Sequence, residues 1–379
     1  AYSLTMTSTS LDALFRPRSV AVIGASERPG SIGAIVARNL REARFSGRVM
    51  AVNPRHRKIG GEPAYPDVAS LPESPDLGVI CTPPGAVAGI VEALGARGTR
   101  AAVVITAGFG EHAEGGRVLQ DAVRAAAAKH RLRLVGPNCL GVIVPGSGLN
   151  ASFAHRMPAP GRLAFVAQSG AVLAAVIDWA APRGIGFSTL VSLGDMADVG
   201  FGDLLDHLTR DPATRGILLY IEAIQDARHF MSAARAAART KPVIVVKAGR
   251  HPEGARAVAS HTGVLAGTDA VYDAAFRRAG VLRVGGLAEL FDAAEILALA
   301  RPPQGDRLLV LSNGGGIAVL AADELIGQGG HLAELPAETV TALDAVLPPS
   351  WSGGQPGVWI GGADGCGYAD ALGAVAGSP

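Results

Sequence analysis

Short apolar runs alternate with alanine-rich helical stretches along the whole chain. In the first third of the sequence the apolar runs predict buried strands at 19–25, 48–54, 77–84, 100–108 and 132–138. The stretches between them predict helices at 32–43, 85–97 and 115–129. This alternation is typical of right-handed βαβ units, which build a parallel sheet with helices on both faces.

The same pattern returns after a Gly/Pro-rich stretch at 144–161, which has the composition of a linker. The second block predicts strands at 162–168, 187–194, 216–223, 242–249 and 281–285. Its predicted helices are 170–181, 200–210, 226–239, 268–279 and 286–300. A third block opens at 306–325 with strand, Gly-rich turn and helix, and its length suits about two strands and two helices. We therefore predict an α/β fold with domains at 11–148, 149–300 and 301–379, the last of them incomplete.

Composition narrows the class of protein. The chain has 379 residues, enough for two or three domains, with 49% hydrophobic residues, 50 glycines and 5% aromatics. A net charge of +1 gives no global attraction to nucleic acid or an acidic membrane, and we see no membrane span or signal peptide. The histidines show no metal-ligand spacing, so we predict no metal site. Cys81, Cys139 and Cys366 form no CxxC pair, so we expect a reduced, cytoplasmic protein.

The first glycine-rich turn is a candidate phosphate site. It ends a predicted strand, opens a helix, and lets a phosphate approach backbone N–H groups through small residues at Gly24, Ala25, Ser26, Gly30, Ser31 and Gly33. An ordinary tight βα turn is the alternative interpretation.

The end of the second predicted strand indicates which nucleotide would bind. An NAD site has an acidic residue there, but this chain has Asn53 and Pro54 followed by a basic run that includes Lys58. The basic run favours a nucleotide with an extra ribose phosphate, such as NADP or coenzyme A, unless it is only a solvated loop. Small-residue turns after the next two strands add Thr82, Pro83, Thr106 and Ala107 as candidates.

In the second domain, Ser169 and Gly170 lie at a strand–helix junction, where a hydroxyl and backbone N–H groups can hold an anion. Ser169 can also be simply the helix N-cap. Glu222 ends an apolar strand, where a buried carboxylate needs a partner. It can orient an imidazole, or it can pair with a local arginine.

The segment "ASHTGVLAG" (259–267) holds His261 between Ser260 and Thr262, with Gly263 next. A neutral imidazole is a nucleophile toward phosphorus at pH 7, and small neighbours leave room for the phosphoryl group. His261 is therefore a candidate nucleophile toward phosphorus, and a purely structural histidine is the alternative interpretation.

Several motifs resemble those of NDP-forming acyl-CoA synthetases, relatives of succinyl-CoA synthetase. They are "SVAVIGAS", "GPNCLGV" (136–142), "AQSGA" and "KxGRxxxGARAxxSHTGxxAG", and the resemblance covers about 11–330. It implies a Rossmann-like CoA-binding domain, a flavodoxin-like ligase domain and the start of a second flavodoxin-like domain. It also implies a phosphorylated His261 supported by Glu222, a phosphoryl group held at Ser169-Gly170, and CoA bound near Ala25–Gly33, with Asn138 added to the CoA-binding candidates.

The implied reaction is acyl-CoA + phosphate + NDP ⇌ acid + CoA + NTP, with acetate as the expected acid. ATP or ADP and Mg²⁺ would bind only to an ATP-grasp domain or β subunit, which we do not find in these 379 residues. Either a partner supplies that domain, in an oligomer, or the chain is a fragment. The family motif like "NPVDxxGDA" is replaced by "QPGVWIGGADG" (355–365), which leaves the role of the third domain open.

Two alternatives stay open. Other stretches, such as "LDALFRPRSVAVIGAS" and "LNASF", resemble long bacterial proteins that fuse this region to a GNAT protein lysine acetyltransferase. In such a protein the chain would be a non-catalytic acyl-CoA sensor, which need not keep His261 and Glu222. An NADP-dependent oxidoreductase is the second alternative, but it assigns no role to the "SHTG" turn.

Overall fold

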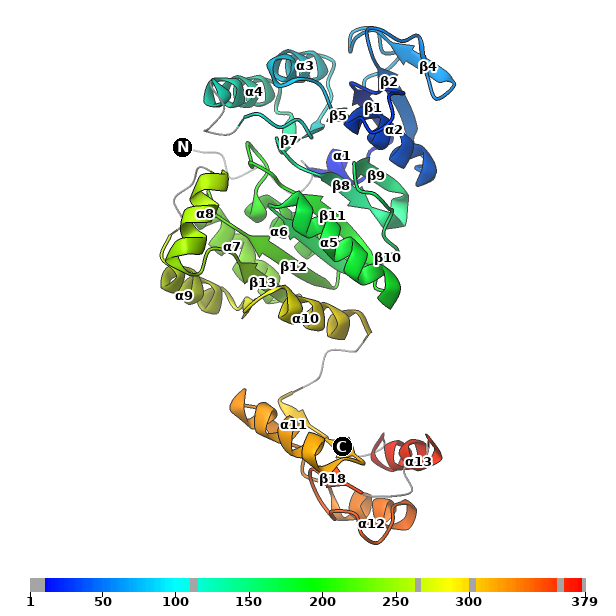
Figure 1. The fold of residues 1–379 in the computed structure, drawn as a ribbon, viewed down its shortest axis with the longest axis vertical. Coiled ribbons are helices and arrows are strands. Elements are labelled where there is room, and N and C mark those ends of the chain that lie inside the picture. The colour runs from blue at the N-terminus through cyan, green and yellow to red at the C-terminus, as the bar shows by residue number, and fades with distance from the viewer. Residues whose placement is uncertain (1–10, 110–114, 263–266, 300–304, 360–364, 377–379) are drawn as a thin grey trace. The chain divides into compact units, whose positions relative to one another are not determined.

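The computed structural model describes residues 11–109, 115–262, 267–299, 305–359 and 365–376. The chain divides into two compact units, residues 1–300 and 301–379. The first unit holds two seven-stranded, mainly parallel sheets with helices packed on them (Figure 1). This confirms the predicted α/β class.

The first sheet has the order β3-β4-β2-β1-β5-β6-β7. Its strands are β1 (Ser19–Ile23), β2 (Arg48–Val52), β3 (Lys58–Ile59), β4 (Glu62–Tyr65), β5 (Leu77–Ile80), β6 (Ala101–Val104) and β7 (Arg133–Val135). Its helices are α1 (Asp12–Phe15), α2 (Ile32–Glu42), α3 (Pro84–Ala96) and α4 (Gly116–His130). Alternate residues of β1 belong to two different apolar clusters, one shared with α1 and α2 and one with α3 and α4, so helices cover both faces. The strand order reverses between β1 and β5, and such a switch point leaves a crevice at the carboxyl ends of the strands.

The second sheet has the order β14-β13-β12-β10-β11-β8-β9. Its strands are β8 (Gly141–Val144), β9 (Leu149–Ser152), β10 (Pro160–Ala167), β11 (Phe187–Ser192), β12 (Gly216–Ile221), β13 (Val243–Lys247) and β14 (Leu282–Val284). Its helices are α5 (Gly170–Ala180), α6 (Phe201–Arg210), α7 (Ala227–Ala238), α8 (Pro252–Thr262), α9 (Asp269–Ala279) and α10 (Leu287–Leu299). Helices α5 and α10 pack on one face, and α6, α7 and α9 pack on the other. The order reverses between β10 and β12, which makes a second switch point.

The stretch that composition suggests is a linker is instead partly a buried strand. All four residues of β9 are buried, and β9 pairs antiparallel with β8, which pairs antiparallel with β11. The amide of Asn39, on α2, donates to the carbonyls of Ser152 and Ala154 at 2.9 and 2.8 Å. The linker interpretation of 144–161 is therefore wrong for β9, because short polar-looking strands gain their burial from tertiary contacts that composition does not record.

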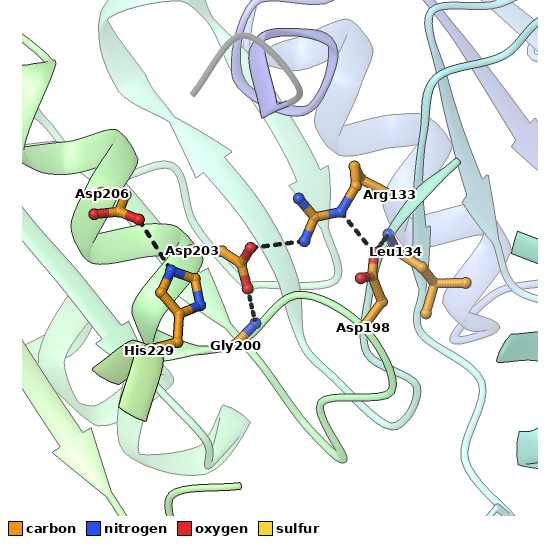
Figure 2. A network of polar contacts seen from close by, with 7 residues as sticks. All are labelled: Arg133, Leu134, Asp198, Gly200, Asp203, Asp206 and His229. Atoms are coloured by element: carbon orange, nitrogen blue, oxygen red, sulfur yellow. Dashed lines mark hydrogen bonds and ion pairs between the residues drawn. The ribbon is translucent and has the colours of Figure 1, made fainter. Parts of the chain in front are cut away.

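A second set of contacts joins the two sheets at the end of β7. The backbone N–H groups of Ala197 and Val199 donate to the carbonyls of Gly136 and Leu134 at 2.9 and 3.0 Å. The buried guanidinium of Arg133 binds Asp198 and Asp203 at 2.9 and 2.8 Å (Figure 2). Burial disfavours the charged guanidinium, but the two carboxylates outweigh it and raise the pKa of Arg133.

The structure contains elements that the sequence analysis did not predict, among them β3, β4 and α8. Strands β3 and β4 form a small antiparallel pair, and β3 begins at Lys58, the last residue of the basic run that follows β2. Helix α8 occupies most of the segment around His261, which the sequence suggests is a small-residue turn. Pro252 at its first position and Glu253 in its first turn are ordinary helix-start signals, but Gly254 and the small residues after it obscure the apolar periodicity.

The second unit is small. It contains α11 (Gly315–Gly327), α12 (Ala337–Val346) and α13 (Gly365–Ala376), and four two-residue strands, β15 (Arg307–Leu308), β16 (Leu311–Ser312), β17 (His331–Leu332) and β18 (Gly357–Val358). A compact cluster that includes Trp351 and Trp359 forms its core. The sequence suggests about two strands and two helices for this unit. Its described residues form three helices and four strands, and each strand is only two residues long.

We predict that Arg133→Met lowers the free energy of unfolding by about 3 kcal/mol, because it leaves two carboxylates at a domain junction without their cation. Urea unfolding followed by circular dichroism measures this change. Arg100→Met, at an exposed arginine before β6, is the matched control and should stay within about 0.5 kcal/mol of wild type. Equal stability of the two variants would contradict the proposed role of Arg133.

Candidate functional site

A cavity of about 1180 Å³ opens at the carboxyl ends of β1 and β5, at the first switch point. We call it the β1–β5 cavity. It brings together nine of the residues predicted to bind the nucleotide: Gly24, Ser26, Gly30, Ser31, Gly33, Asn53, Pro54, Thr82 and Pro83. The remaining cofactor candidates, Ala25, Lys58, Thr106, Ala107 and Asn138, are not among its lining residues.

The glycine-rich turn is held by its own hydrogen bonds. The Ser31 hydroxyl donates to the Arg28 carbonyl at 2.8 Å, and the Arg28 N–H donates to the Ser26 hydroxyl at 3.0 Å. Because the Ser31 side chain is used in this way, it does not cap α2, and the first turn of α2 keeps its positive end toward the cavity. A Cβ on Gly33 would lie 1.9 Å from the Gly24 carbonyl oxygen, so only glycine allows this close turn. The arrangement suits a pyrophosphate.

Basic side chains line the same cavity. Arg28 comes from the glycine-rich turn, and Arg55 and His56 come from the segment after β2. Asn53 holds this segment in place, because its amide donates to the Ala25 carbonyl and accepts from the Arg55 N–H. The basic run was visible in the sequence, but Arg28 was missed, because its contribution depends on how the turn folds back.

Two threonines support the far wall of the cavity. The buried Thr106 hydroxyl donates to the Thr82 carbonyl at 2.7 Å, which gives Thr106 a structural role behind the lining. The Thr82 hydroxyl is buried and has no hydrogen-bond partner among the described residues. A buried hydroxyl normally forms a hydrogen bond. A polar group of a ligand in the cavity would therefore supply the missing partner of the Thr82 hydroxyl.

A second cavity, of about 480 Å³, lies at the N-terminus of α5, at the second switch point. We call it the α5 cavity. It brings together five predicted residues from both domains: Ala107, Asn138, Ser169, Gly170 and Glu222. The Ser169 hydroxyl accepts from the Val172 N–H at 3.3 Å, so Ser169 is the N-cap of α5 and also lines the cavity. A Cβ on Gly170 would lie 3.0 Å from the Leu140 Cβ, so a larger residue at this position would crowd the N-terminus of α5.

Glu222 is buried at the end of β12, only 6% exposed. The N–H groups of Glu222 and Ala223 both donate to the Gln168 side-chain oxygen, at 2.6 and 2.8 Å. Gln168 therefore fixes the strand end that carries Glu222. The sequence analysis missed Gln168, although it directly precedes Ser169.

Lys247 is a buried cation at the end of β13, beside the end of β12 that carries Glu222. Its ammonium lies 4.5 Å from the centre of the Tyr272 ring and donates to the Ala248 carbonyl. Burial lowers the pKa of Lys247, against the opposing attraction of Asp269 and, to a smaller extent, Glu222. Lys247 and Glu222 thus attract each other electrostatically.

The predicted phosphohistidine segment is described only in part. Ser260, His261 and Thr262 form the last turn of α8, and their side chains lie outside the described residues, as does all of Gly263. The structure therefore joins Ser169, Gly170 and Glu222 in one cavity and gives only the backbone position of His261.

The structure also bears on metals, membranes and thiols. Among the described residues, no cluster of His, Cys, Asp or Glu could hold a metal ion, and no helix is long and apolar enough to cross a bilayer.

Cys81 and Cys139 are free. Burial raises the pKa of Cys81, which lines the β1–β5 cavity, to about 12, which disfavours its thiolate at neutral pH.

Family models match both sheet domains: a CoA binding domain at 18–145 and a succinyl-CoA ligase like flavodoxin domain at 160–297. The α subunit of the ADP-forming acetate–CoA ligase I of Pyrococcus furiosus is 41% identical, over 96% of this chain and 79% of that protein. The ADP-forming acetate–CoA ligase I of Archaeoglobus fulgidus is 44% identical, over 89% of this chain but only 49% of that protein. The chain thus spans about half the length of this relative and about four fifths of the α subunit.

A solved structure agrees with these relatives. The acetyl-coenzyme A synthetase 1 of Candidatus Korarchaeum cryptofilum, in complex with phosphate and ADP, superimposes with a TM-score of 0.92 at 36% identity. The match covers 96% of this chain and 79% of that one. The resemblance expected from the sequence is confirmed: the chain belongs to the family of ADP-forming acyl-CoA synthetases, to the part that forms the α subunit in Pyrococcus furiosus.

Proposed function

We propose that this chain is the CoA-binding, phosphohistidine-bearing part of an ADP-forming acyl-CoA synthetase, with acetyl-CoA as the expected thioester. One observation carries the proposal: the switch points of the two sheets open into adjoining cavities that share Ile32. One cavity has the glycine turn and cations that suit CoA. The other has a helix N-terminus and Glu222, which suit phosphate and an imidazole.

In the proposed reaction, CoA lies in the β1–β5 cavity with its pyrophosphate at the start of α2. Thr82 and the lining arginines complete its polar contacts. Phosphate lies at the Ser169-Gly170 end of α5, where backbone N–H groups and the helix dipole hold an anion. A phosphate oxygen attacks the thioester carbonyl, the C–S bond breaks, and the CoA thiolate leaves and takes up a proton. The product is an acyl phosphate.

The second step is phosphoryl transfer. A nitrogen of His261 attacks phosphorus, the bond to the acyl oxygen breaks, and the free acid leaves. Glu222 orients the imidazole and stabilises its positive charge during the transfer, as a carboxylate does in a catalytic triad. Ser260, Thr262 and Gly263 leave room for the phosphoryl group and donate hydrogen bonds to it. Positioning and electrostatics supply most of the catalysis in such a step.

The full reaction needs a nucleotide site. We propose that ADP and Mg²⁺ bind to an ATP-grasp domain or β subunit in an oligomer, and that the phosphohistidine passes its phosphoryl group to ADP there. The name of the Pyrococcus relative, a subunit alpha, supports a partner of this kind. We also propose a reducing, cytoplasmic setting, in line with the free thiols of Cys81 and Cys139, and the domain limits 11–148, 149–300 and 301–379.

We predict that His261→Ala abolishes phosphorylation of the chain while leaving CoA affinity unchanged, because the CoA-lining residues belong to other segments. Intact-protein mass spectrometry at neutral pH, with acetyl-CoA and phosphate, detects an acid-labile phosphoryl adduct. His251→Ala, at an exposed histidine just before α8, is the matched control and keeps the adduct.

A second sample contains Mg-ATP and a cognate ATP-grasp partner, so that phosphorylation is tested from both directions. CoA binding without any adduct in either sample would favour the acyl-CoA sensor of a GNAT protein instead. Equal loss of phosphorylation and CoA binding in His261→Ala would contradict the roles assigned to the two cavities.

We predict that Arg55→Glu weakens CoA about tenfold more than dephospho-CoA, because a charged hydrogen bond to the 3′-phosphate is lost and a like charge is added. Isothermal titration calorimetry with the two ligands measures the difference. Lys58→Glu is the comparison, since Lys58 is exposed on β3 outside the cavity lining. A larger selective loss in Lys58→Glu would assign the 3′-phosphate to Lys58, as the sequence suggests.

A further inference from the structure

The β1–β5 cavity and the α5 cavity meet at one side chain. Ile32, the first residue of α2, lines both of them and is 41% exposed. An exposed isoleucine between two cavities offers apolar surface to a flexible arm that crosses from one to the other. If CoA binds as proposed, its pantetheine arm crosses Ile32 and carries the thioester into the α5 cavity. The inference below rests on that proposed function.

The α5 cavity has a polar side and an apolar side. Ser169, Gly170 and Glu222 form the polar side at the strand ends. The apolar side is formed by Leu140, Phe153 and Ala174, which belong to or pack against one apolar cluster. Ala174 lies four residues after Gly170 on α5, so both residues are on the same helix face, one turn apart. An acyl group whose carbonyl lies at Gly170 therefore extends along α5 toward Ala174.

We propose that the apolar side of the α5 cavity is the acyl subsite and that Ala174 and Phe153 set the maximum size of the acyl group. The methyl side chain of Ala174 leaves the volume beside Leu140 and Phe153 open. A branched side chain at this position fills that volume. It blocks bulky acyl groups and leaves the two-carbon acetyl group in place.

The experiment measures single-turnover release of CoA with inorganic phosphate, using a chromogenic thiol reagent, for acetyl-, isobutyryl- and phenylacetyl-CoA. Ala174→Leu should slow the phenylacetyl thioester about 30-fold more than it slows the acetyl thioester. Ala175→Leu places the same side chain at the next, exposed position of α5 and is the matched control.

The affinities of phenylacetyl-CoA and of CoA for each variant are measured alongside, because binding needs no turnover. Equal slowing of all thioesters in Ala174→Leu, or the same selectivity in Ala175→Leu, would overturn the size argument. If wild type releases no CoA from any thioester, the proposed function fails. The acyl subsite then stands only if Ala174→Leu weakens phenylacetyl-CoA but not CoA.

Discussion

The site depends on how firmly the first sheet is held against the second. The chain leaves β7 and enters the antiparallel hairpin β8–β9, which forms the edge of the second sheet and also receives two hydrogen bonds from Asn39 on α2. The buried guanidinium of Arg133, at the start of β7, forms ion pairs with Asp198 and Asp203, which belong to the second domain. One apolar cluster runs through both sheets. Because the α5 cavity takes residues from both sides of this junction, small shifts between the sheets would change the site itself.

The positions of the two cavities follow from topology. In parallel α/β sheets a ligand crevice forms where strands on either side of a switch point send their connections in opposite directions. The first sheet has this point between β1 and β5, and the second has it between β10 and β12. Each cavity opens there, and each takes a glycine or hydroxyl residue from the first βα turn of its sheet. The fold thus provides two cavities of similar construction, and in the proposed function the differences in their other residues suit them to different ligands.

The sequence predicted the regular part of the molecule well, because apolar runs of buried parallel strands need no tertiary information to be seen. Nine of the nucleotide candidates line one cavity for a related reason: they lie in, or just after, the turns that follow strands whose ends must meet. The failures are residues whose role depends on distant contacts. The polar-looking β9 is buried only because β8 and α2 cover it. Gln168 matters because its side chain reaches the end of β12, and Arg28 because its turn folds over the cavity.

The α5 cavity shows why such a site resists prediction from local motifs. Ile32, Asn138, Phe153, Ser169 and Glu222 come from five separate segments of the chain, and none of these segments alone specifies an acyl pocket. The motifs around Ser169 and His261 indicate phosphoryl chemistry, since anion binding at a helix N-terminus is a local property. Selection among acids depends instead on the side chains that the docking of the two domains places opposite that helix. In the proposed acyl subsite, relatives can therefore keep the same phosphate-handling motifs and differ in the acid they use, by changes at positions such as Ala174 that none of the quoted motifs contains.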